Sequence, residues 1–592
     1  MGKISSTDRR GRRLSARSKT ATNTSAARWL ARTLPFLLIA GMAMLAGWPV
    51  AQAQDSAAKP GKAAIASAHY MATEAGHEIL AAGGNAFDAA IAVSSVLAVV
   101  EQTSSGIGGG GFWLLHRAED DFEVMIDGRE KAPGAATTDM YLDAEGNVDR
   151  DLAVNGPLAA GIPGEVAALA HIAENYGRLS LAESLQPAIR IAREGFPVYE
   201  KFHTMLGWKK DVIKRWPAAS EAFLLDGEVP PMGHVIKLPD MAEVLEAVAE
   251  HGPDVFYRGE IAQRLVDGVR EAGGIWTMED MAAYNVVERE PIRTEYLGYE
   301  LVTASPPSSG GVAIATMLNI LEGYDLENMD RVPRAHRVAE AMRRAYRDRA
   351  LFLGDPDFYD VPVERLTNQY YADGLRASIH PDKATPSDML PGNADRTERE
   401  DTTHFSIMDA EGNLVAATLT VNLAFGNAFM VPGTGFVLNN EMDDFSAKPG
   451  VPNAFGLIGF EANEIQPGKR PLSSMSPTII RGQDKVGVIG TPGGSRIITM
   501  VLLGILDFMD GNDPEHWVSL PRYHHQFVPD HISAEPDAFT PEEVAALEAM
   551  GHTVEVSSRR WGNMHGVLWN QETGAVSAGS DPRSDAGKAI VR

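Results

Sequence analysis

The stretch Asp-Thr-Thr-His-Phe-Ser at 401–406 lies deep inside the sequence, yet it begins a clear two-strand pattern. The pattern predicts a strand from Thr402 to Met408, a three-residue turn at 410–412 and a second strand from Leu414 to Asn422. Three-residue hairpin turns place one residue in the left-handed region of backbone conformation, which glycine tolerates, and Gly412 fits that position. The stretch is therefore predicted to open a β-hairpin.

The register of this hairpin follows from the turn. If Asp409 pairs with Asn413, Thr402 lies directly opposite Thr420, with Cβ atoms about 5 Å apart. Asn422 is two residues further along and projects from the same face. The other face is mostly apolar and is predicted to be core; it collects Thr403, Phe405, Ile407, Val415, Ala417, Leu419 and Val421. A shift of one residue would exchange the two faces, so the register matters.

The threonine cluster has two interpretations. Threonine is a common strand residue, and on the hairpin alone β-propensity is the favoured explanation. The chemical interpretation is an N-terminal threonine nucleophile, whose hydroxyl is activated by its own α-amino group. That amine has a reference pKa of about 8, which suits a base at neutral pH. Such chemistry requires the bond between Asp401 and Thr402 to be broken first.

Composition excludes several classes of function. The chain has 592 residues, of which 22% are charged and 44% hydrophobic, and these shares are ordinary for a globular enzyme with a large core. It contains no cysteine, which excludes a thiol nucleophile, a disulfide framework, thiolate zinc sites and iron–sulfur clusters.

The N-terminus resembles a secretory signal. Residues 1–33 are basic and polar, residues 34–50 are apolar, and Ala51-Gln52-Ala53 has the small-x-small cleavage pattern. The alternative is a retained membrane anchor, because the apolar run has 17 residues and lies at the lower limit for a span. Cleavage after Ala53 is favoured, with 1–53 as the signal peptide. The protein is then expected in the periplasm or secreted.

Removal of this segment makes the chain strongly acidic. Residues 1–53 hold nine Lys or Arg and one Asp, so the remaining chain keeps 44 basic and 78 acidic residues, a formal charge of −34. Such a surface repels nucleic acids and anionic membranes. A small acidic substrate would need local positive charge to bind.

Two further segments bear on organisation. Residues 106–111 read Gly-Ile-Gly-Gly-Gly-Gly without the Gly-Lys-Ser/Thr ending of a phosphate loop, which favours close backbone packing over nucleotide binding. Residues 381–401 are rich in proline and charge and are predicted to be an exposed linker, where a chain can be cut. Helices are predicted at 71–82, 86–100, 240–251, 312–321, 335–353 and 495–509.

Several long motifs occur in the order of one known family. They are Asp127-Gly-Arg-Glu130, Pro306-Pro-Ser-Ser-Gly-Gly311, Gly354-Asp-Pro-Asp-Phe358, Thr402-Thr-His404, Leu438-Asn-Asn-Glu-Met-Asp-Asp-Phe445, Arg470-Pro-Leu-Ser-Ser-Met-Ser-Pro477 and Thr491-Pro-Gly-Gly-Ser-Arg496. Over roughly residues 60–590 the chain resembles the gamma-glutamyltranspeptidase family of N-terminal nucleophile hydrolases. The resemblance implies an α+β fold, a four-layer αββα sandwich. It also implies self-cleavage into a large subunit, 54–401, and a small subunit, 402–592, which stay interlocked.

The resemblance assigns catalytic roles. It implies that Thr402 attacks the γ-amide carbonyl of a glutamyl compound and that Thr420 holds the Thr402 hydroxyl, in agreement with the derived register. Gly493 and Gly494 would supply two backbone N–H groups as an oxyanion hole, and the loss of one such donor typically costs about 100- to 1000-fold in rate. Without the other motifs, Gly493 and Gly494 would be interpreted as an ordinary Gly-Gly turn before a helix.

The resemblance also assigns the binding of a zwitterionic substrate. Its carboxylate would bind Arg129, Ser473 and Ser474, because a guanidinium matches a carboxylate in geometry. Its ammonium would bind the acceptors Asn422, Glu441 and Asp444. Residues 449–459 resemble a lid over the substrate, with Phe455 where tyrosine is usual. Because phenylalanine donates no hydrogen bond, we expect a looser lid and a shift toward hydrolysis.

The function implied is a gamma-glutamyl hydrolase and transferase acting on glutathione and related amides, with water, amino acids or dipeptides as acceptors. No metal and no cofactor are implied. The nearest alternative is a glutaryl-type β-lactam acylase, whose substrates lack the α-ammonium. A further alternative is an inactive, uncleaved binding protein. A Gly-x-Ser-x-Gly elbow and a His-Glu-x-x-His zinc signature are both absent from the sequence.

Overall fold

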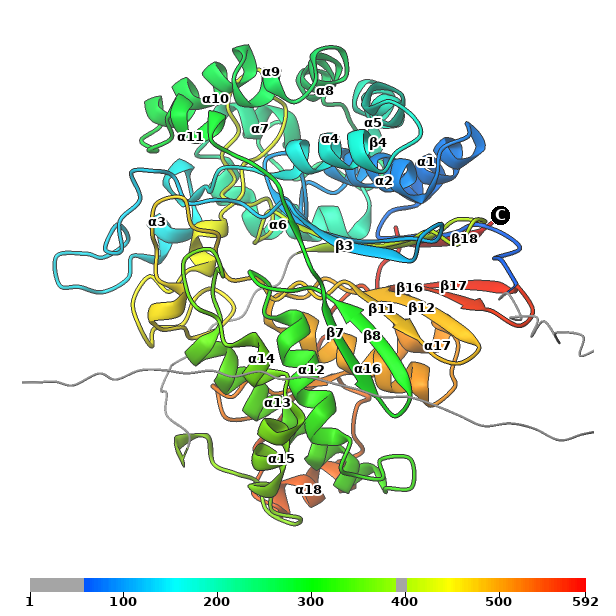
Figure 1. The fold of residues 1–592 in the computed structure, drawn as a ribbon. Helices are drawn as coiled ribbons and strands as arrows, with labels where there is room; N and C mark the ends of the chain where they lie inside the picture. The colour runs from blue at the N-terminus through cyan, green and yellow to red at the C-terminus, as the bar shows by residue number, and fades with distance from the viewer. Residues whose placement is uncertain (1–57, 390–401) are drawn as a thin grey trace, which may run out of the picture. The chain divides into compact units, whose positions relative to one another are not determined.

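The computed structural model describes residues 58–389 and 402–592 (Figure 1). The predicted signal peptide, 1–53, and Asp401 lie outside the described residues. Within the described ranges, every helix is too short or too polar to cross a membrane.

Two antiparallel sheets form the centre of the molecule. The seven-stranded sheet has the order β18-β1-β9-β10-β2-β3-β6, and the six-stranded sheet has the order β17-β16-β12-β11-β8-β7. The first comprises β18 (Lys588–Val591), β1 (Ala64–Ser67), β9 (Thr403–Met408), β10 (Leu414–Thr420), β2 (Gly110–Arg117), β3 (Phe122–Asp127) and β6 (Val287–Arg289). The second comprises β17 (Val576–Ser580), β16 (His565–Asn570), β12 (Lys485–Gly490), β11 (Thr478–Arg481), β8 (Tyr299–Thr303) and β7 (Ile292–Tyr296).

The two sheets pack face to face, as Figure 1 shows. Their shared core is apolar: Ala64, Ala66, Leu114, Met408, Leu414 and Ala416 from one sheet meet Val302, Ile479, Val486, Val488 and Val567 from the other. Both faces of the hairpin are thus buried, one against helices and the other against the second sheet. This explains why all residues of β9 and β10 are buried.

Helices cover the outer face of each sheet (Figure 1). The seven-stranded sheet is covered by α1 (Tyr70–Ala81), α2 (Ala86–Val100), α4 (Glu165–Asn175), α5 (Leu181–Glu194), α6 (Glu200–Ile213), α7 (Pro217–Phe223), α8 (Pro239–His251), α9 (Asp254–Tyr257), α10 (Glu260–Glu271) and α11 (Met278–Ala282). The six-stranded sheet is covered by α12 (Gly310–Leu321), α13 (Arg331–Phe352), α14 (Val363–Leu366), α15 (Gln369–Ala377), α16 (Ile497–Met509), α17 (Pro514–Ser519) and α18 (Pro541–Ala549). The fold is therefore a mixed α and β one, as predicted.

Short elements complete the chain. They are α3 (Arg150–Val154), β4 (Phe196–Pro197), β5 (Val235–Ile236), β13 (Tyr523–His524), β14 (Ile532–Ala534), β15 (Val554–Val556) and the 3₁₀ turns η1 (Pro157–Ala159), η2 (Ser387–Met389), η3 (Glu441–Asp444), η4 (Glu461–Asn463) and η5 (Gly494–Arg496).

The predicted hairpin register is confirmed. The pairs Leu414↔Met408 and Leu419↔Thr403 have the predicted sum, and Gly412 has φ +97°. The predicted core face also holds, because Phe405, Ile407, Val415, Ala417 and Leu419 all join the core beneath the helices. The strands are slightly shorter than predicted: β9 begins at Thr403 rather than 402, and β10 ends at Thr420.

The glycine run packs backbone against backbone, as its composition suggests. A Cβ on Gly108 would lie 2.2 Å from the Val437 carbonyl oxygen, and one on Gly109 would lie 2.1 Å from the Thr420 carbonyl oxygen. Real Cβ atoms do not approach this closely, so larger residues would displace the end of β10. The run thereby supports the strand that carries Thr420.

Candidate active site

The two threonines of the predicted site lie at adjoining strand ends. Thr402 directly precedes β9 and is buried, and the confirmed register places it opposite Thr420, the last residue of β10. The Thr420 hydroxyl accepts a 2.7 Å hydrogen bond from the Asn422 backbone N–H. Asn422 has φ +75°, which ends the strand, and its side-chain NH₂ donates to the Asn440 carbonyl at 2.9 Å. The Asn422 side-chain oxygen remains the end that could accept from an ammonium.

The glycine pair lies on the loop that leaves β12. This loop starts beside the hairpin, because a Cβ on Gly490 would lie 2.2 Å from a ring carbon of His404, two residues after Thr402. Gly493 and Gly494 have φ +144° and +53°, a backbone that side chains rarely adopt. Gly493 caps η5 and Gly494 is its first residue, directly before α16, where backbone N–H groups lack partners within a helix. The pair thus lies at the start of a helical segment, on a loop that begins beside the hairpin.

The lid residue packs on this loop. A Cβ on Gly494 would lie 2.5 Å from the Phe455 ring, so the ring covers the glycine directly. The lid backbone is shaped by Asn453, whose side-chain oxygen accepts from the N–H groups of Phe455 and Leu457 at 3.0 and 3.1 Å. Phe455 is buried.

Three residues of the predicted substrate end form a buried ion cluster. Arg129 follows β3 and is 1% exposed; its Nη1 lies 2.6 Å from Glu441 Oε2 and its Nη2 lies 2.5 Å from Asp444 Oδ2. Burial disfavours the charge of Arg129, but Glu441 and Asp444 outweigh it and raise the arginine pKa above its ordinary value. Burial raises the pKa of both acids. We call Arg129, Glu441 and Asp444 the ion triad.

The serine pair adjoins the ion triad through one loop. Arg129 Nε donates to the Pro471 carbonyl at 3.2 Å, two residues before Ser473. The Ser473 carbonyl accepts from the Ser309 N–H at 2.8 Å, which fixes the loop on the start of α12. The predicted substrate-binding residues are therefore buried, except for Asp444, whose side chain is 11% exposed. Asn422 adjoins the loop of Glu441 and Asp444 through its contact with Asn440.

Sequence reasoning missed a second buried arginine at this end. Arg349 of α13 donates to the Ser474 hydroxyl at 3.3 Å and to the Ser309 hydroxyl at 3.0 Å. Burial lowers its pKa, while the negative charge of Asp444 acts against that shift. A signal was present, because Arg349 falls on the apolar stripe of its helix, four residues after Ala345. A charged residue on such a stripe indicates a buried partner.

One group of side chains has the composition of a metal site but not its chemistry. His336, Glu340 and His552 are buried, and their ligand atoms lie within 4.8 Å of one another. However, the two imidazoles are hydrogen-bonded at 2.7 Å, and Glu340 Oε2 accepts from Arg344 and Thr385, each at 2.6 Å. A guanidinium in contact with the carboxylate disfavours a second cation. We assign this cluster a structural role.

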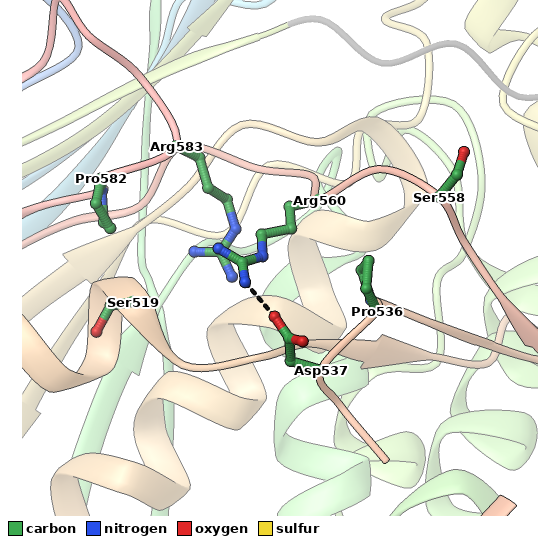
Figure 2. Close-up of a pocket in the computed structure, with 7 residues that line it drawn as sticks. All are labelled: Ser519, Pro536, Asp537, Ser558, Arg560, Pro582 and Arg583. Carbon is green, nitrogen blue, oxygen red and sulfur yellow. Dashed lines mark hydrogen bonds and ion pairs between the residues drawn. The ribbon is translucent and has the colours of Figure 1, made fainter. Parts of the chain in front are cut away.

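A surface pocket of about 600 Å³ lies apart from the predicted residues (Figure 2). It is lined by Ser519, Pro536, Asp537, Ser558, Arg560, Pro582 and Arg583. Its charges are already matched: Arg560 pairs with Asp537, as Figure 2 shows, and Arg583 pairs with Glu535 at 2.6 Å. None of the residues predicted from the sequence lines it.

The comparison with known proteins decides the family. The family model described as gamma-glutamyltranspeptidase matches residues 72–591. The chain belongs to the gamma-glutamyltranspeptidase family. It is 41% identical over 526 residues to the glutathione hydrolase proenzyme of Escherichia coli strain K12, covering 88% of this chain and 90% of that relative.

Two solved structures show the same likeness. The cephalosporin acylase of Bacillus halodurans is 29% identical with a TM-score of 0.80, covering 90% of this chain and 96% of that one. The gamma-glutamyltranspeptidase of Helicobacter pylori is 38% identical with a TM-score of 0.54, covering 55% of this chain and 94% of that one. The predicted family and enzyme class, a hydrolase and acyltransferase of the gamma-glutamyltranspeptidase type, are confirmed.

Proposed function

We propose that Thr402, once freed as an N-terminal residue, transfers the γ-glutamyl group of glutathione and related amides to water, amino acids or dipeptides. The Thr402 hydroxyl oxygen attacks the γ-carbonyl carbon while its own α-amine takes the proton. The N–H groups of Gly493 and Gly494 stabilise the oxyanion. The C–N bond then breaks, and the leaving nitrogen takes the proton from the Thr402 amine. Water or an acceptor amine attacks the resulting ester and restores the hydroxyl.

The observation that carries this proposal is the ion triad. A γ-glutamyl group carries a carboxylate and an ammonium on one carbon. Its carboxylate would take the place of an acid on Arg129, assisted by Ser473 and Ser474, and its ammonium would bind the released Glu441 and Asp444 together with Asn422. The exchange keeps the charges of the ion triad paired, which a buried site requires.

We infer further that the chain is made as a precursor and cleaved between Asp401 and Thr402. The products are residues 54–401 and 402–592, interlocked as the four-layer αββα sandwich of N-terminal nucleophile hydrolases. The relatives named proenzymes support this. The Helicobacter pylori chain supports it too, because it corresponds to 55% of this chain, close to the share of residues 54–401.

The predicted signal peptide supports export, so we propose that the mature enzyme acts in the periplasm or outside the cell. Its partners are then small γ-glutamyl compounds and amine acceptors, and its two subunits are partners of each other. Neither a metal nor a cofactor enters the proposed reaction.

The second candidate function is a glutaryl-type β-lactam acylase, which the likeness to the Bacillus halodurans acylase favours. A glutaryl group has no α-ammonium, so it would displace an acid from Arg129 and leave that acid buried without a cation. Such unpaired charges are costly. The ion triad therefore favours γ-glutamyl substrates.

The test combines processing with turnover. Purified protein should run as two fragments on a denaturing gel, and N-terminal sequencing of the smaller one should begin at Thr402. Glutathione should release glutamate, whereas glutaryl-7-aminocephalosporanic acid should turn over at least tenfold more slowly. Thr402→Ala should stay one polypeptide without activity. A single unbroken wild-type chain, or turnover by Thr402→Ala, would contradict the proposal.

A further inference from the structure

A buried ion pair lies behind the first residue of β9, on the face that carries the helices. Glu101 directly follows α2, and its Oε1 lies 2.6 Å from Lys201 Nζ on α6. Its Oε2 accepts a 2.6 Å hydrogen bond from the Thr403 hydroxyl. Lys201 also donates to the Ser104 hydroxyl at 2.9 Å. Glu101 and Thr403 are 0% exposed, and both oxygens of the carboxylate have a partner, as a buried charge requires.

The contact with Glu101 matters at the start of β9 because this end of the strand has few other pairing partners. Thr403 pairs with Leu419 of β10, but pairing with β1 begins only at Phe405, opposite Ser67. Cleavage before Thr402 would turn these first residues into a chain end. Chain ends fray unless they are tied down. The hydrogen bond from the Thr403 hydroxyl to Glu101 therefore holds the start of β9, where β1 makes no pairing contact.

We propose that Lys201, Glu101 and Thr403 are positioning residues that hold the adjoining Thr402 in place for attack. The inference rests on the proposed role of Thr402. Lys201 and Glu101 belong to residues 54–401 and Thr403 to residues 402–592, so the contact spans the cleavage point and survives the loss of the covalent link. The three residues act through Thr402 and touch no substrate. Because a misplacement of about 1 Å can cost about 100-fold in rate, even partial loosening would be measurable.

The test compares Thr403→Val, which removes the hydroxyl and keeps the shape, with Thr403→Ser, which keeps the hydroxyl. The matched control is Thr385→Val, because the Thr385 hydroxyl donates to buried Glu340 of α13 at the same 2.6 Å, in the helical layer that covers the other sheet. Turnover of γ-glutamyl-p-nitroanilide is measured per processed molecule. We expect Thr403→Val to lower kcat about tenfold with KM within twofold, Thr403→Ser to recover most of kcat, and Thr385→Val to leave kcat unchanged.

Two further measurements keep the outcome decisive. Glu101→Gln keeps an acceptor for Thr403 but loses the charge pair with Lys201, so a kcat about threefold lower is expected even where Thr403→Val is not processed. Equal kcat values for Thr403→Val or Glu101→Gln and for Thr385→Val would overturn the inference. Activity in Thr402→Ala would instead overturn the proposed function, so the two failures are distinguishable.

Discussion

Arg129 is the residue on which we expect substrate selection to depend, because it pairs with both Glu441 and Asp444 in a largely buried cluster. In the proposed function, an acid in this position binds the ammonium of the substrate. With a substrate that has no ammonium, the same acid would stay buried without a cation, which costs free energy. We therefore expect selectivity at this site to follow from the charges paired with Arg129.

Asp444→Asn tests that balance. The substitution removes a charge that should bind the substrate ammonium, and hydrogen bonds to charged groups contribute about 1.5–3 kcal/mol, or about 10- to 150-fold. We expect kcat/KM for γ-glutamyl-p-nitroanilide to fall by about that factor and kcat/KM for glutaryl-p-nitroanilide to change less than threefold. Asp357→Asn, which disturbs the pair between half-exposed Asp357 and Arg289, serves as control. An equal loss on both substrates would refute the assignment.

Phe455→Tyr tests the lid at the same scale. The ring already covers Gly494, so the substitution adds a hydroxyl without a new packing requirement at that glycine. We expect the ratio of γ-glutamyl transfer to hydrolysis to rise severalfold, because a hydrogen bond from the tyrosine would hold water out more tightly. Glutamate and γ-glutamylglycylglycine are quantified from one reaction. An unchanged ratio would count against the hypothesis.

At the scale of elements, the glycine run and β10 form one support for Thr420. Gly109→Ala would place a Cβ 2.1 Å from the Thr420 carbonyl oxygen, where backbone and not a flexible side chain must move. Overpacking of this kind costs about 1–3 kcal/mol or more. We expect a lower melting temperature and slower processing on a denaturing gel.

The control for this prediction is Gly374→Ala in α15, where a Cβ would meet nothing within 4 Å. Alanine is favoured over glycine within helices by up to about 1 kcal/mol, so this variant should be neutral or stabilised. Identical behaviour of the two variants would show that the close approach at Gly109 is not important for stability.

Asp443 of η3 is hydrogen-bonded to residues 449–459, and its raised pKa predicts that the stability of the protein depends on pH. Asp443 Oδ2 accepts from the Ala454 N–H at 2.8 Å, and burial raises the pKa of Asp443 from 3.8 to about 6. The folded state therefore holds this proton more tightly than the unfolded state. Its contribution to stability is complete below pH 4 and is lost as the pH rises through 6.

Asp443→Asn should remove this contribution. A shift of about two units corresponds to about 3 kcal/mol. The melting temperature of the variant relative to the wild type should thus rise between pH 4 and pH 7. Thermal denaturation at both pH values provides the measurement, and a difference that stays constant with pH would contradict it.

At the scale of the whole molecule, the sequence predicts local features such as turns and helices. It does not predict which distant segments come into contact. The turn at Gly412 sufficed to place Thr402 opposite Thr420, and the helix predicted at 86–100 matches the bounds of α2. Nothing local relates Arg129 to residues 312 positions away, so the ion triad could be named as separate ligands but not as one cluster. The contacts of Arg349 and Glu101 depend on packing between layers, which a single sequence does not encode in a readable pattern.

The strand order of the larger sheet has a mechanical consequence. Strands from either side of residue 402 alternate at its centre, since β1 lies between β18 and β9, and β2 follows β10. After cleavage, the two fragments of such a sheet cannot separate as intact pieces. Separation would break hydrogen-bonded strand pairs in the middle of the sheet. If the chain is cleaved before Thr402, the two fragments should therefore melt together in one step, at a temperature that falls on dilution because unfolding releases two separate chains.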